Sequence, residues 1–138
     1  MGLPHAPEAR PFYQAAKQRF EDSQFLLEAG RTTGAIYLAG YSVECILQAL
    51  ILAQVAEEKR VEMLGSFRGA KAHDYDWLKA RYSENGGPEF PKTISRAFSF
   101  VNTWAVEIRY KAGTSKYEDA KTFVDSVEAI MTWADGRM

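Results

Sequence analysis

The stretch from Gly34 to Lys59, GAIYLAGYSVECILQALILAQVAEEK, decides the fold class of this chain. Its first half is apolar at nearly every position, which is typical of a helix that other helices surround. Glu44 lies near the middle of the stretch, and a carboxylate at the centre of a bilayer costs roughly 2.5–3.5 kcal/mol. We therefore predict the central helix of a soluble bundle here, rather than a membrane span.

Polar and aromatic side chains interrupt this helix at regular intervals. Tyr37, Tyr41, Glu44 and Gln48 follow one another at steps of four, three and four residues, so they form a stripe along one helix face. Core packing alone does not predict such a stripe. We refer to these four residues as the polar stripe, and we treat it as the first candidate for a functional surface.

Three other main helices and a short one follow from apolar residues at three- and four-residue spacing. The main helices are expected over residues 12–29, over residues 92–110, and after the capping-box sequence Ser115–Glu118. The short helix is expected over residues 74–81. We expect Thr32 or Thr33 to cap the central helix. Arg19 is assigned to the solvent-facing side of the first helix. The sequence predicts an all-α, up-and-down bundle of four main helices plus a short helix, with a flexible tail over residues 1–11 and a single domain over residues 12–138.

Composition excludes several functional classes. The chain has 138 residues, and its 17 Lys and Arg residues against 18 Asp and Glu residues give a net charge of −1. A broad basic face for nucleic acid is therefore not expected, and any anion-binding site must be local. Its single cysteine, Cys45, and its two histidines argue against a disulfide, a thiolate zinc cluster or any other metal site. Without a phosphate-binding loop or another cofactor motif, no cofactor is predicted. The N-terminus lacks a signal-peptide pattern, and we expect a cytoplasmic protein without a membrane partner.

Glu44 is the first candidate site residue. An unpaired carboxylate inside a bundle is costly, so Glu44 is expected either to form a buried ion pair or hydrogen bond, or to orient a cation in a cleft. Arg109 is the candidate partner, because a cation at the C-terminus of a helix is favourable and can point into the groove. Cys45 is expected to be a small buried apolar residue without chemistry of its own.

His73 is the second candidate, in the segment KAHDYDWL from Lys71 to Leu78. Its structural role would be to bond the backbone or cap the short helix, whereas its functional role would be acid–base chemistry. Arg68 and His73 have the spacing Arg-x-x-x-x-His, which we interpret as a chance occurrence. Further along, Arg109, Tyr110 and Lys111 combine basic and aromatic side chains that are suited either to a phosphate and a base or to a solvated loop.

These segments resemble a known family. Residues 35–50, AIYLAGYSVECILQAL, preceded by Gly30 and Arg31, resemble the second helix of HEPN domains (higher eukaryotes and prokaryotes nucleotide-binding). The segment HDYDWL from His73 and the segment WAVEIRY from Trp104 to Tyr110 are similar to later segments of that family, in the same order. The resemblance covers about residues 12–134 and implies a helical bundle that commonly forms homodimers with a polar groove between the protomers.

The resemblance also implies an RNA-related function. Many HEPN proteins are metal-independent ribonucleases that use an Arg followed shortly by a His, and others bind nucleotides or RNA or accompany a nucleotidyltransferase in toxin–antitoxin and defence systems. In this chain Arg109 matches the Arg, but Thr114, Ser115 and Lys116 stand where the His would be. General acid–base cleavage then lacks its best-suited group at neutral pH.

The favoured interpretation is a dimeric nucleotide- or RNA-binding module, partnered by a nucleotidyltransferase and lacking the ribonuclease dyad. Arg109 and Lys111 would contact phosphate, Tyr110 would stack or hydrogen-bond, and Glu44 with Tyr41 would position Arg109. A metal-independent ribonuclease toxin that uses Arg109 with His73 is the enzymatic alternative. A purely structural partner subunit, whose groove another chain covers, is the third.

Overall fold

The computed structural model describes the backbone of residues 2–108 and 116–138, and within these residues it is helical without any strand. The α-helices are α1 (Arg10–Glu28), α2 (Thr32–Gln54), α3 (Arg60–Ser66), α4 (Tyr75–Glu84), α5 (Lys92–Ile108) and α6 (Tyr117–Asp135). Short 3-10 helices lie at η1 (Pro7–Ala9), η2 (Glu57–Lys59) and η3 (Ala70–His73). The predicted all-α class is confirmed.

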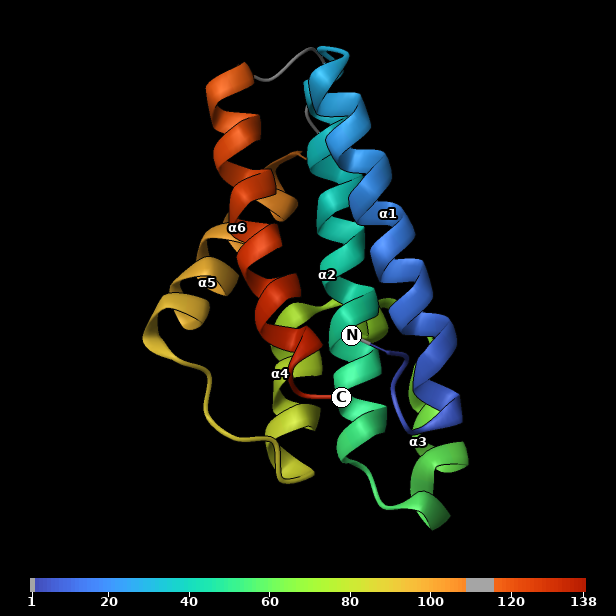
Figure 1. Cartoon of the computed structure of the whole chain (residues 1–138). Helices are drawn as coiled ribbons and strands as arrows, with labels where there is room; N and C mark the ends of the chain where they lie inside the picture. Colours follow the sequence, from blue (N-terminus) through green and yellow to red (C-terminus); the bar gives the residue numbers. More distant parts are fainter. Residues whose placement is uncertain (1, 109–115) are drawn as a thin grey trace.

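Helix α2 forms the centre of the bundle and contacts each of the other five α-helices. Figure 1 shows α1 and α2 side by side, α6 on the other side of α2, and α5 beyond α6. By length and composition α2 is apolar enough to cross a membrane, but 78% of the most apolar window is buried inside the bundle. That burial is what an apolar helix in the core of a bundle requires.

The core is built from aliphatic side chains of α2 and from apolar residues of the helices around it. Hydroxyl groups within it bond their own helices: Ser42 Oγ donates to the carbonyl oxygen of Ala39 at 2.6 Å, and Ser23 Oγ donates to that of Phe20 at 2.6 Å. Fully buried α2 residues include Ile36, Val43, Ile46, Leu47, Leu50, Ile51 and Leu52. Leu78, Phe98, Phe123 and Ile130 of the neighbouring helices belong to the same core cluster.

Several predicted boundaries are wrong for identifiable reasons. Helix α2 ends at Gln54 because Val55 has an extended backbone with ψ 138°, and the charged stretch that follows forms η2 and then α3, a helix that the sequence pattern did not reveal. The residue that caps α2 is Arg31, with no side-chain cap bond, so the predicted threonine cap is not made. The residue that caps α6 is Lys116, without a side-chain cap bond, whereas Ser115 of the predicted capping box lies outside the described residues.

The segment predicted to be a flexible tail contains packed residues. Pro4, Ala6 and Ala9 are buried, and Arg10 Nε donates to the carbonyl oxygen of Pro4 at 2.9 Å. Helix α1 therefore begins at Arg10, with Pro11 in the first turn, where a missing N–H is tolerated. The helical body starts earlier than the predicted boundary at residue 12.

An aromatic cluster holds the connection from α4 to α5 against α6. The Tyr82 ring stacks on Phe90 at 5.4 Å between centroids and meets Trp133 edge-on at 6.5 Å. Gly87 lies directly over this cluster, and its N–H donates to the carbonyl oxygen of Tyr82 at 2.9 Å. A Cβ atom at position 87 would overlap the ring of Tyr82, which is 1% exposed and lies between Phe90 and Trp133 in the aromatic cluster.

We predict that Gly87→Ala destabilises the protein by about 1–3 kcal/mol, the usual cost of overpacking a filled core. Gly65→Ala is the matched control, because nothing lies within 4 Å of a Cβ atom there and Gly65 is inside α3. That control should be neutral or slightly stabilising. Urea denaturation of both variants measures the difference, and equal stabilities would contradict the packing seen at Gly87.

Cys45 is buried in α2, and burial raises the pKa of its thiol to about 11. Because only the thiolate is nucleophilic, we predict that native protein at pH 8 reacts with Ellman's reagent about a hundredfold more slowly than protein unfolded in guanidinium. The rate of absorbance change gives this ratio directly. Comparable rates in the folded and unfolded states would show that Cys45 is not shielded as described.

Candidate functional site

The centre of the candidate site is a contact between α2 and the 3-10 helix η3. His73 Nδ1 lies 2.9 Å from Glu44 Oε2, at the distance of a hydrogen bond or, with a protonated ring, a salt bridge. The Glu44 side chain is only 13% exposed, whereas the His73 side chain is 57% exposed. A mostly buried carboxylate therefore holds an imidazole that solvent and ligands can reach.

Two further contacts fasten η3 and the start of α4 to α2. Gln48 Nε2 donates to the carbonyl oxygen of Ala72 at 3.3 Å, and Tyr75 Oη donates to that of Gly40 at 2.7 Å. Gln48 and Tyr75 are both buried. His73 therefore sits on a segment fixed on both sides, and its ring position follows from the fold.

Asp74 separates η3 from α4 and is the N-cap of α4. Its Oδ1 accepts hydrogen bonds from the backbone N–H of Asp76 at 2.9 Å and of Trp77 at 3.3 Å. The helix-capping role that the sequence allowed for His73 thus belongs to Asp74. At the other end of η3, Gly69 has φ +75°, a left-handed conformation that favours glycine and turns the chain from α3 into η3.

The geometry at His73 also selects a tautomer. An ionised carboxylate can only accept hydrogen bonds, so the proton in the contact with Glu44 belongs to Nδ1 of His73. In the neutral ring Nε2 then carries the lone pair and can bind or remove a proton. This arrangement suits hydrogen bonding to an anion when the ring is protonated and general-base chemistry when it is neutral.

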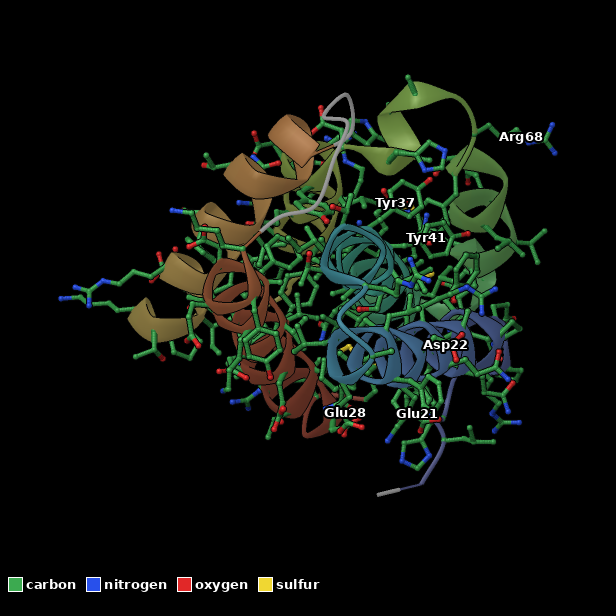
Figure 2. All side chains as sticks on the ribbon, turned by 90° about the horizontal axis from the view of Figure 1, so that it is seen from above. Glu21, Asp22, Glu28, Tyr37, Tyr41 and Arg68 are labelled. Carbon is green, nitrogen blue, oxygen red and sulfur yellow. The ribbon has the colours of Figure 1, made fainter. Side chains whose placement is uncertain are left out.

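The polar stripe becomes progressively covered along α2. Tyr37 is 59% exposed and Tyr41 is 40% exposed, whereas Glu44 and Gln48 lie beneath η3. In Figure 2, Tyr37 and Tyr41 leave α2 toward the green segment that contains α3 and η3. One half of the stripe therefore fastens η3, and the other half offers two aromatic rings to solvent beside His73.

Arg19 of α1 lies at the edge of the same surface. Its guanidinium carbon is 5.8 Å from the centroid of the Tyr41 ring, which is a cation–π contact. Burial is the main cause of the raised pKa of Cys45. Two nearby charges also act on this pKa: Glu44 raises it and Arg19 lowers it. Tyr41 precedes Glu44 by three residues on the same face of α2, so the Arg19 guanidinium over the Tyr41 ring lies on the side of α2 that carries Glu44.

The structure places the predicted site residues as follows. It brings His73 to Glu44 and leaves Tyr41 exposed in the adjacent turn of α2. Arg109, Tyr110 and Lys111, predicted as phosphate- and base-contacting residues, lie outside the described residues. Arg68 does not join His73, because its side chain points away from the body of the protein in Figure 2. Cys45 is a buried apolar residue, as predicted.

Arg19 is the site residue that sequence reasoning missed. The sequence places it among charged neighbours on the solvent-facing side of the first helix. However, Phe12, Arg19 and Leu26 are spaced by seven residues and therefore lie in one row along α1. Both of these residues pack against the core. An arginine at this position of a partly buried row is the available signal, since a long side chain can cover apolar surface while its charge reaches the edge.

The donor set of the site consists of a carboxylate, an imidazole, two phenols and a guanidinium. Among the residues that the structure describes, no three His, Cys, Asp or Glu side chains gather as metal ligands. Positively charged donors together with exposed aromatic rings are suited to a phosphate group and a base.

Comparison with known proteins agrees with this architecture. The family model of the HEPN domain matches residues 9–137, nearly the whole chain. Comparison with curated proteins and with solved structures gave no significant match. The match begins at the packed N-terminal residues and extends beyond α6, so it includes all six α-helices and the site that they carry. This chain belongs to the HEPN domain family.

Proposed function

We propose that this HEPN domain is a nucleotide- or RNA-binding module whose site lies at the junction of α2 and η3. The observation that carries the proposal is the exposed His73 ring, held at 2.9 Å by the mostly buried Glu44. Family membership supports a nucleotide- or RNA-related role in general. The Glu44–His73 pair supports this particular surface as the place where a ligand binds.

The physical case for a nucleotide ligand rests on two kinds of group. A protonated His73 can donate from Nε2 to a phosphate oxygen while Nδ1 stays on Glu44. The exposed rings of Tyr37 and Tyr41 can stack with bases, an interaction that is worth about 1–3 kcal/mol per base. Both groups lie on one small surface, which is compatible with a net charge of −1.

The biological setting is part of the same proposal. A chain of this family with an anion-binding surface would act as a homodimer in the cytoplasm and as the partner of a nucleotidyltransferase in a toxin–antitoxin or defence-type system. The surface around Tyr37 and Tyr41 is open in the isolated chain and is free to meet such a partner. Co-purification from the native host, followed by light scattering, tests both the partner and the dimer.

We predict that His73→Ala weakens the binding of a labelled single-stranded RNA ten-mer and of AMP about tenfold, the loss expected for one charge-assisted hydrogen bond. Glu44→Gln should weaken binding less, because the amide oxygen of a glutamine can still accept the hydrogen bond from Nδ1 of the ring, although less strongly than a carboxylate does. Fluorescence anisotropy and calorimetry measure these affinities. Arg109→Ala, titrated in parallel, tests the predicted phosphate contact at that position.

His5→Ala is the control, because His5 is the other histidine of the chain and is an exposed residue before α1. Its affinity should equal that of the wild type. Absence of binding by the wild-type protein would reject the binding module and leave the structural subunit. Equal affinities of wild type and His73→Ala would move the site elsewhere on the chain.

A metal-independent ribonuclease is the second candidate, and the tautomer at His73 favours it. With Nδ1–H on Glu44, the neutral ring presents Nε2 as a base for the 2′-hydroxyl of RNA. The 2′-oxygen would then attack the phosphorus, the bond to the 5′-oxygen would break, and the leaving oxygen would take up a proton. The products would be a 2′,3′-cyclic phosphate and a free 5′-hydroxyl.

For this candidate we predict RNA cleavage in the presence of EDTA that falls at least about a hundredfold in His73→Ala, a typical contribution of a general base. Glu44→Gln should lower the rate while sparing part of it, since the base would be less well oriented. Gel analysis of a defined RNA, with detection of the cyclic phosphate, provides the measurement. Cleavage that survives in His73→Ala would exclude His73 as the base.

A further inference from the structure

Arg19 occupies a position that the proposed function does not yet use. It projects from α1, whereas Tyr41 and Glu44 belong to α2 and His73 belongs to η3. Its guanidinium lies 5.8 Å from the Tyr41 ring centroid. Tyr41 and Glu44 are three residues apart and so are neighbours on the face of α2. Arg19 therefore reaches the site from α1 through the Tyr41 ring, whereas His73 reaches it from η3.

The guanidinium of Arg19 also keeps its hydrogen-bonding capacity. Within residues 2–103 and 116–138, whose side chains the structure describes, no carboxylate forms a salt bridge with it. Its recorded contact is the face of Tyr41, which engages the ring-facing side of the group and leaves its N–H donors in the plane available. By contrast, Arg81 and Lys121 each form a salt bridge with a carboxylate of their own helix.

We propose that Arg19 is a phosphate-binding residue of this site, so that a phosphate of a single-stranded RNA lies between Arg19 and His73 and an adjacent base stacks on the exposed Tyr37. The proposal rests on the proposed binding function. Arginine matches a phosphate because its fork of donors can bind two oxygens at once. The Tyr41 ring holds the fork in place and lowers the entropy lost on binding.

The surroundings of Arg19 on α1 set the expected specificity. Asp22 lies three residues further along, on the same side of the helix, and is exposed. In Figure 2, Glu21 and Glu28 lie on the other side of α1, away from the tyrosines. Asp22 is thus the acidic residue of α1 closest to Arg19, and its charge opposes a second phosphate. The surface should therefore bind a short strand at one phosphate rather than follow a long backbone.

Arg19→Gln tests the proposal, with Lys17→Gln as the matched control. Lys17 is also a cation over a tyrosine on α1, at 5.6 Å from the Tyr13 ring centroid, but it lies two residues before Arg19 and therefore on a different face of the helix. Arg19→Gln should weaken binding of the labelled RNA ten-mer about tenfold and lower the slope of log affinity against log salt by about 0.7, the value for one phosphate on a single strand. Lys17→Gln should leave both quantities unchanged.

Two more variants separate charge from geometry. Arg19→Lys keeps the charge but loses the fork, so it should retain the salt slope while losing about threefold in affinity. Asp22→Asn removes the opposing charge and should strengthen binding by about twofold to threefold. Thermal melting of each variant confirms that it is folded, and the Arg19→Lys result remains informative if Arg19→Gln melts early.

The outcomes distinguish this inference from the function on which it rests. A wild-type protein that binds no RNA overturns the binding module and, with it, the role of Arg19. If His73→Ala weakens RNA binding but Arg19→Gln and Lys17→Gln bind RNA equally well, the role of Arg19 alone is overturned. Binding that Arg19→Gln weakens with the lower salt slope supports the phosphate contact.

Discussion

Burial of α2 on nearly all sides is the constraint on which the rest of this structure depends. A helix that five others contact can be polar only where each polar group finds a partner, because an unpaired buried carboxylate costs several kcal/mol. Glu44 meets this condition through His73, and Gln48 through the backbone of η3. The position of η3 is therefore a consequence of placing polar residues on the central helix. The candidate site forms where this requirement ends and the stripe reaches solvent at Tyr41.

The sequence was sufficient for the bundle because its signals are local. Apolar residues at helical spacing placed α1, α4 and α5 within a few residues of their observed bounds, and they also located α2 and the start of α6, although α2 ends at Gln54 rather than at Lys59. Helix α3 was missed because its seven residues carry a glycine and no fully buried side chain, so no apolar periodicity marks it. Helix caps were predicted from residue preference alone, whereas Arg31 and Lys116 cap through backbone conformation without a side-chain bond.

The site was only half predictable, for a different reason. The polar stripe and His73 could be named from the sequence, but their pairing joins positions 29 residues apart and depends on how η3 folds back on α2. Arg19 was counted as a solvent-facing charge, since nothing near it in the sequence reveals that Tyr41 lies across the gap between α1 and α2. Side chains that meet across elements follow from packing, and packing is not encoded in local spacing.

The two halves of the polar stripe have different roles, and this difference affects how a function can change on this fold. Glu44 and Gln48 hold η3, so replacing either one removes a contact that fixes the segment carrying His73. Tyr37 and Tyr41 can vary at little cost to the core, because their exposed rings meet solvent in the folded and unfolded states alike, whereas a change of His73 removes its hydrogen bond to the mostly buried Glu44. The stability of the bundle and the chemistry of its surface therefore reside on opposite halves of one row of side chains. A chain can lose or gain a ligand, or a base for RNA cleavage, at this surface while α2 and its five neighbours stay as they are.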